Sequence, residues 1–144
     1  MVISIITALI SGLLMSVQGV FNTRVTEKSG LWFTTSIVHF IAFICCLAVL
    51  LFVRDARLEG LKEVNKLYLL GGVLGAGITY TVILAMSKLG PACAVMLILV
   101  AQMTIAYLIE VFGLFDTQKI GFVWTKFLGV VIMICGILLF QCRK

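Results

Sequence analysis

The side chains best suited to chemistry in this sequence are a few amides, hydroxyls and one imidazole, placed within long apolar runs. On the first run the polar residues recur at steps of four, seven and four, which keeps them near one face of a helix. These residues are Thr7, Ser11, Gln18 and Asn22. Polar groups in apolar surroundings are costly unless they line a wet cavity or bond a neighbouring helix, and the sequence leaves both roles open.

Two further residues are candidates for binding and releasing a proton, and so for coupling proton movement to another process. His39, the only histidine, lies in the second apolar run, one helical turn beyond Thr35. A histidine there can change its charge near neutral pH, although a neutral ring satisfied by a hydroxyl or carbonyl is the favoured interpretation. Glu110 ends the fourth run, eight residues beyond Gln102. A solvated interfacial acid and a proton or cation site suit Glu110 equally well.

The sequence contains no recognisable catalytic or metal-binding constellation. It has no nucleophile elbow, no His-Glu-x-x-His, no phosphate-cradling glycine loop and no paired carboxylates within the apolar runs. The five cysteines form no Cys-x-x-Cys or Cys/His cluster, and their odd number argues against a disulfide framework. We therefore expect no enzyme, no metal and no cofactor.

The overall composition indicates a membrane protein. Hydrophobic residues make up 62% of the 144 residues and charged residues 12%, whereas a soluble domain carries about 25% charged residues. This composition excludes a soluble enzyme. The net charge of +5 comes from basic residues beside the apolar runs, where they face phospholipid headgroups. The predicted surroundings are therefore a lipid bilayer, and nucleic acid is not expected as a partner.

Five apolar runs are each long enough to predict a membrane-crossing helix. We predict an all-α integral membrane bundle of five transmembrane helices, forming a single domain over residues 1–144. The predicted helices cover about 2–21, 31–53, 67–86, 91–111 and 126–142. Pro91 fits the first turn of the fourth helix, and Gly113 offers its C-cap. The long polar connection Arg54–Lys66 predicts a loop in preference to a surface helix.

Glycines on three of the predicted helices are suited to close helix packing. They are Gly12, Gly71, Gly75, Gly129 and Gly136. Gly71 and Gly75 form a Gly-x-x-x-Gly pair, and Gly129 and Gly136 lie two turns apart. We expect most of these glycines to pack helices together within the bundle. Only one row of small residues should form the contact between two copies of a dimer.

The basic residues divide almost evenly between the two sides of a five-span protein. One side would hold six of the 11: Arg54, Arg57, Lys62, Lys66, Lys119 and Lys126. The other side would hold five: Arg24, Lys28, Lys88, Arg143 and Lys144. Because the Lys/Arg difference sets orientation, this balance predicts dual topology. The alternative is that one helix or flank dominates insertion.

Four short motifs follow one another along the chain. They are Gln18-Gly-Val-Phe-Asn22, Leu70-Gly-Gly-Val-Leu-Gly75, Leu89-Gly-Pro91, and Ala101-Gln102 through Leu108-Ile-Glu-Val-Phe-Gly113. In this order and spacing they resemble the YdcZ-like branch of the drug/metabolite transporter superfamily, whose bacterial members are small five-span inner-membrane proteins. The resemblance implies an exporter of small metabolites or drugs, located in the bacterial inner membrane and assembled from two inverted halves.

These observations together predict a secondary transporter that works as an antiparallel homodimer, because one chain without an internal repeat cannot supply two pseudo-symmetric halves. A heterodimer with a sister chain is the competing assembly. A non-transporting membrane subunit or assembly partner is the competing function. The residues predicted to line a shared substrate cavity are Gln18, Asn22, His39 and Gln102, with Ser11 and Tyr80 as further contributors.

Overall fold

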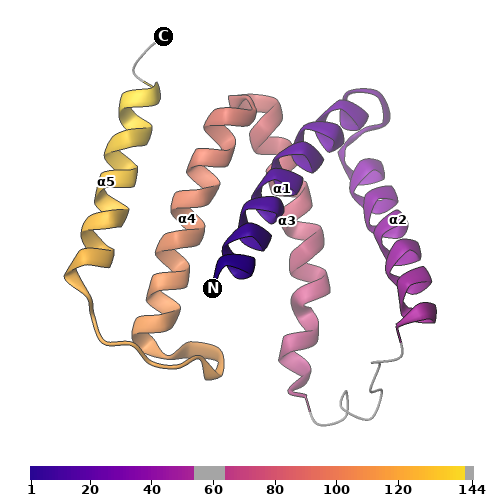
Figure 1. Ribbon diagram of the computed structural model, residues 1–144. Coiled ribbons are helices and arrows are strands. Elements are labelled where there is room, and N and C mark those ends of the chain that lie inside the picture. Colours follow the sequence, from indigo (N-terminus) through magenta and orange to yellow (C-terminus); the bar gives the residue numbers. More distant parts are fainter. Residues whose placement is uncertain (54–63, 142–144) are drawn as a thin grey trace. The chain divides into compact units, whose positions relative to one another are not determined.

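The structure is a computed structural model that describes residues 1–53 and 64–141 (Figure 1). Most of the predicted loop Arg54–Lys66, together with Cys142, Arg143 and Lys144, lies outside the described residues. Within the described part the regular structure is entirely helical, with no strand. The predicted all-α class is therefore confirmed. The chain divides into two compact units, Met1–Lys88 and Leu89–Lys144, called here the first unit and the second unit.

The first unit begins with a helical hairpin. Helix α1 (Val2–Ser29) ends at Gly30, whose φ of 83° suits glycine, and α2 (Leu31–Phe52) starts directly after it (Figure 1). A short 3₁₀ helix, η2 (Lys66–Leu70), then leads into α3 (Gly71–Leu89).

Helix α1 continues well beyond residue 21, where the predicted helix ends. Its last turns are polar but still favour a helix. The Arg24 guanidinium lies 3.0 Å from the Glu27 carboxylate one turn along, and Lys28 stands in the last turn, where a positive charge complements the helix dipole. The predicted end marked the limit of the apolar run and missed this polar extension.

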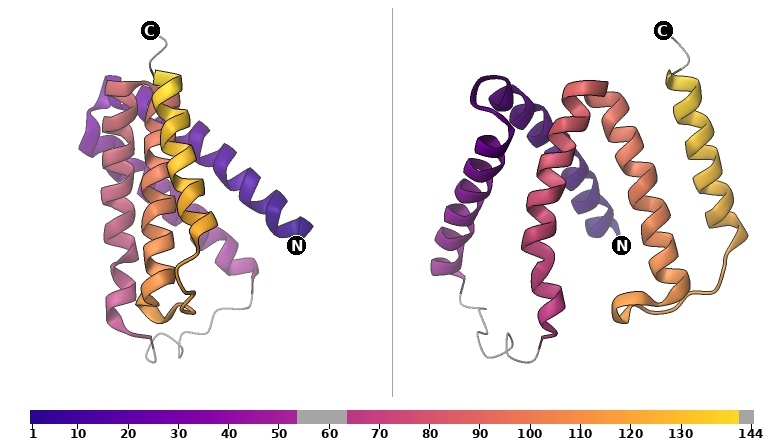
Figure 2. Two further views of the ribbon diagram at one scale, coloured as in Figure 1. Left: turned by 90° about the vertical axis from the view of Figure 1, so that its left-hand side faces the viewer. Right: turned by 180° about the vertical axis from the view of Figure 1, so that it is seen from behind.

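The second unit is a pair of antiparallel helices, as both views in Figure 2 show. Helix α4 (Pro91–Phe112) has its proline in the first turn, as predicted, and Gly113 caps its end with a left-handed φ of 66°. A short 3₁₀ turn, η3 (Leu114–Asp116), follows, and α5 (Trp124–Gln141) returns alongside α4.

Four helical segments of the described chain are long and apolar enough to cross a membrane: α1, α2, η2 with α3, and α4. The apolar part of α5, Trp124–Phe140, is shorter. Large apolar side chains are exposed along all five helices, which suits a protein whose solvent is lipid. The buried residues in the described part of the first unit are Gly19, Asn22, Thr34, Thr35, Ile83 and Met86.

Candidate functional site

Two threonines at the start of α2 show how the first unit satisfies buried hydroxyl groups. Thr34 and Thr35 are buried, and their hydroxyls donate to the carbonyls of Gly30 and Leu31 at 2.8 and 2.9 Å. Each bond runs back one turn of the same helix, so neither threonine needs a partner on another helix.

The imidazole of His39 is different, because no group of the described chain bonds its buried nitrogen. Nε2 is buried and has no hydrogen-bond partner among the described residues. The nearby Thr35 hydroxyl donates to its own helix instead. A Cβ added to Gly75 on α3 would lie 3.7 Å from Cε1 of His39, so this glycine leaves room for the ring. The favoured interpretation of a satisfied ring therefore stays a prediction.

Tyr80, also on α3, lies against α2. Its ring centroid is 4.7 Å from that of Trp32, with the two planes tilted by 36°. The structure thus places His39 and Tyr80, both predicted site residues, along the packing between α2 and α3.

The polar face of α1 is divided between an exposed part and a buried part. Ser11 and Gln18 are exposed and line a shallow hollow of about 490 Å³. The side chain of Gln18 has no hydrogen-bond partner within residues 1–53 and 64–141, whereas Thr7 donates to the Ile3 carbonyl at 2.8 Å. Asn22, one turn beyond Gln18, is buried. Thr26 on the next turn, which is not a predicted site residue, also has a buried hydroxyl that lacks a partner in the described chain.

Gln102 lies on α4 in the second unit and is exposed. The other predicted site residues, Ser11, Gln18, Asn22, His39 and Tyr80, all belong to the first unit. The cavity predicted to join Gln102 with them therefore stays a prediction.

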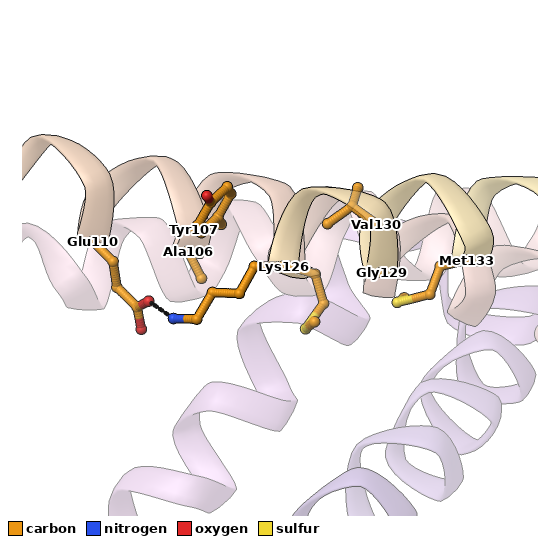
Figure 3. A pocket seen from close by; sticks show the side chains of 8 residues that line it. Ala106, Tyr107, Glu110, Lys126, Gly129, Val130 and Met133 are labelled. Carbon is orange, nitrogen blue, oxygen red and sulfur yellow. Dashed lines mark hydrogen bonds and ion pairs between the residues drawn. The ribbon is translucent and has the colours of Figure 1, made fainter. Parts of the chain in front are cut away.

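The second unit holds an ion pair that the sequence analysis did not predict. Nζ of Lys126 on α5 donates to Oε2 of Glu110 on α4 at 2.6 Å, and the two side chains are 44% and 42% exposed (Figure 3). Glu110 is thus neither isolated nor simply solvated. The sequence held one indication of this pair. Glu110 lies near the end of α4, Lys126 lies near the start of α5, and a short connection joins the two helices.

Tyr107 fixes the connection on which this pair depends. Its hydroxyl accepts from the Val123 N–H at 2.7 Å and donates to the Val123 carbonyl at 3.1 Å. The Ile120 N–H also donates to the backbone carbonyl of Glu110 at 2.9 Å. These bonds hold the start of α5 against the end of α4. The ion pair lines a hollow of about 490 Å³ between the two helices.

The glycines predicted to mediate close packing are mostly open within the chain. A Cβ added at Gly12, Gly71, Gly129 or Gly136 would meet nothing within 4 Å, and only Gly75 of the predicted set has a neighbour. The tightest approach occurs at Gly19, which was not among the predicted packing glycines. A Cβ there would lie 2.5 Å from Cε and 2.6 Å from Sδ of Met86 on α3.

Apolar helices of spanning length, with polar side chains set along them, define a multi-pass α-helical membrane protein. The chain belongs to the family described as "Putative inner membrane exporter, YdcZ", whose model matches residues 3–139. This match confirms the resemblance found in the sequence and the inner-membrane location. No curated protein and no solved structure matched the chain.

Proposed function

We propose that the protein is a secondary transporter that exports small metabolites or drug-like amphiphilic compounds by alternating access. The family supports export. The observation that carries the mechanism is the exposed polar face of α1, where Ser11 and Gln18 stand uncovered on a helix of spanning length. An amide facing lipid is costly. The face therefore needs a wet cavity or a second protein surface, and a central transport pathway between two halves supplies both.

The second half is a second copy inserted upside down, forming an antiparallel homodimer. The near-even division of basic residues supports insertion in both orientations. Gly12, beside the polar face, has open space where a Cβ would stand, so another helix can approach closely there. A heterodimer with a sister chain is the competing assembly.

Dual topology also requires that α5 crosses the membrane as the fifth span of a single domain. Its apolar part, Trp124–Phe140, rises about 25 Å, slightly less than the hydrocarbon core of about 30 Å. Local thinning of the bilayer accommodates such a difference at modest cost. Trp124 suits the interface, and the charge of Lys126 is paired with Glu110. An odd number of spans places the two chain ends on opposite sides.

The substrate pathway in this proposal is lined by the predicted amides and aromatic groups: Ser11, Gln18, Asn22, His39, Tyr80 and Gln102. His39 is the better coupling candidate, because its Nε2 has no partner in the described chain. The carboxylate of Glu110 already contacts Lys126.

Transport by the purified protein in liposomes tests this proposal. We expect Gln18→Leu and Gln102→Leu each to abolish efflux of amphiphilic compounds, with a folded dimer retained. Val17→Leu is the matched control, because Val17 is an exposed neighbour of Gln18 on another face of α1. Unchanged efflux in both glutamine variants would show that the amides only bind a helix. No efflux by the unaltered protein across a broad compound set would favour a non-transporting subunit.

A reporter attached to the C-terminus tests the orientation separately. Dual topology predicts signal from both sides of the membrane. Signal from one side only would overturn it.

A further inference from the structure

The hollow beside the Glu110–Lys126 ion pair continues along the two helices of the second unit. It is about 490 Å³ and is also lined by Met103 on α4. It reaches from the ion pair to Met133 on α5 (Figure 3). A second hollow of about 250 Å³ shares Met133. Its other lining residues are Met96, Leu99, Gly136, Ile137 and Phe140. We call the two hollows together the α4–α5 groove.

Charge is confined to one end of the α4–α5 groove. Beyond the ion pair the lining is apolar apart from Tyr107, and the Tyr107 hydroxyl is already bonded to Val123. From Met96 to Glu110 the helix rises about 21 Å, which exceeds the roughly 15 Å hydrocarbon depth of one leaflet. The groove therefore matches, in length and polarity, a ligand with a long apolar chain attached to a polar head.

The ion pair favours a head that carries both charges. The pair is formally neutral, and each side chain is less than half exposed but still reachable. Oε1 of Glu110 has no partner in the described chain, and the Lys126 ammonium has three donors, of which Glu110 takes one. A purely anionic head would meet Glu110 unfavourably, and a purely cationic head would meet Lys126 unfavourably. A zwitterionic head can satisfy both.

We propose that the α4–α5 groove binds one zwitterionic phospholipid, with its ammonium at Glu110, its phosphate at Lys126 and an acyl chain along the groove. The lipid is a bound partner and not the exported substrate. This site therefore stands whether or not the export proposal holds.

Lipid retention measured by native mass spectrometry tests the site without any transport assay. The protein is reconstituted in vesicles of equimolar phosphatidylethanolamine and phosphatidylglycerol with identical chains, then released in mild detergent. We expect at least threefold more retained phosphatidylethanolamine than phosphatidylglycerol. Glu110→Gln leaves a net positive site, so it should reverse this preference. An unchanged preference in Glu110→Gln would overturn the proposal.

A second pair of variants tests the groove itself. Gly129→Leu fills the first hollow, where an added Cβ meets nothing within 4 Å, and should lower retention of both lipids at least fivefold. Gly77→Leu on α3 is the control, because Gly77 is equally open but does not line the groove. Circular dichroism and gel filtration check that each variant folds. Unchanged lipid retention in Gly129→Leu would overturn the site. A change in oligomeric mass without a change in lipid retention would also overturn it, because that result would indicate a protein interface.

Discussion

Two pairs of polar residues, one pair in each unit, differ in how far along the chain their bonds reach. In the first unit, Thr34 and Thr35 bond to carbonyls of their own helix. In the second unit, Tyr107 and Glu110 on α4 bond to Val123 and Lys126 across the connection to α5. Local bonds can satisfy a hydroxyl at any depth, whereas a charge needs a partner and access to water. The comparison explains why the ion pair lies near helix ends.

The units also differ in what they leave unsatisfied. The first unit retains the unpartnered Nε2 of His39 and the exposed amide of Gln18. The second unit leaves an apolar groove beside a formally neutral ion pair. The proposed coupling residue therefore belongs to the first unit and the proposed lipid site to the second, whereas the proposed substrate pathway draws on both.

The largest effect on stability is expected at the closest helix contact of the first unit. Gly19→Leu forces Met86 out of its buried position, and overpacking of this kind costs about 1–3 kcal/mol. Thermal unfolding in detergent measures the loss. The double variant Gly19→Leu with Met86→Ala should recover most of it, because the alanine vacates the space. Equal instability of the single and double variants would contradict the contact.

The next effect belongs to the second unit. Tyr107→Phe removes both bonds to Val123, and we expect a loss of about 1–2 kcal/mol together with faster amide exchange at Val123. Tyr80→Phe is the matched control, because no hydrogen bond of the Tyr80 hydroxyl is present in the described chain. Equal losses in both variants would show that the connection does not depend on Tyr107.

His39→Leu should separate stability from activity in the first unit. An unsatisfied buried nitrogen is a liability, so its removal should leave stability unchanged or raise it by up to about 1 kcal/mol. Transport should nevertheless be lost, because the variant lacks the proposed coupling group. Thermal unfolding and efflux are measured on the same preparation. A clear loss of stability in His39→Leu would indicate that the imidazole instead stabilises the fold through its contacts.

The smallest stability effect is expected at the ion pair. Glu110→Gln should change the unfolding free energy by less than about 1 kcal/mol, since pairs exposed to this extent contribute little. Unfolding at low and high salt should differ only slightly. A loss well above this value would mean that the pair holds α4 and α5 together.

The features that could be predicted from the sequence are those set by the backbone preferences of neighbouring residues. The start of α4 at Pro91 and its cap at Gly113 follow from proline and glycine backbone preferences, and both are present. Contacts between distant residues were not predictable in this way. Glu110 with Lys126 and Gly19 with Met86 depend on how helices face each other, which apolar periodicity does not specify. The end of α1 was also missed, because a polar segment can stay helical outside an apolar run.

The most direct test of the antiparallel dimer is disulfide cross-linking along the polar face of α1. Thr7→Cys and Gln18→Cys are made separately and co-expressed, in a chain whose native cysteines are replaced by alanine: Cys45, Cys46, Cys93, Cys135 and Cys142. The two positions lie about 16 Å apart along the helix, whereas a disulfide needs Cα atoms within about 7 Å. An antiparallel dimer predicts cross-links between the two variants and none between copies of the same variant. Cross-links only between identical variants would show a parallel dimer and contradict the account, and no cross-link of either kind would show that the polar face of α1 is not the dimer seam.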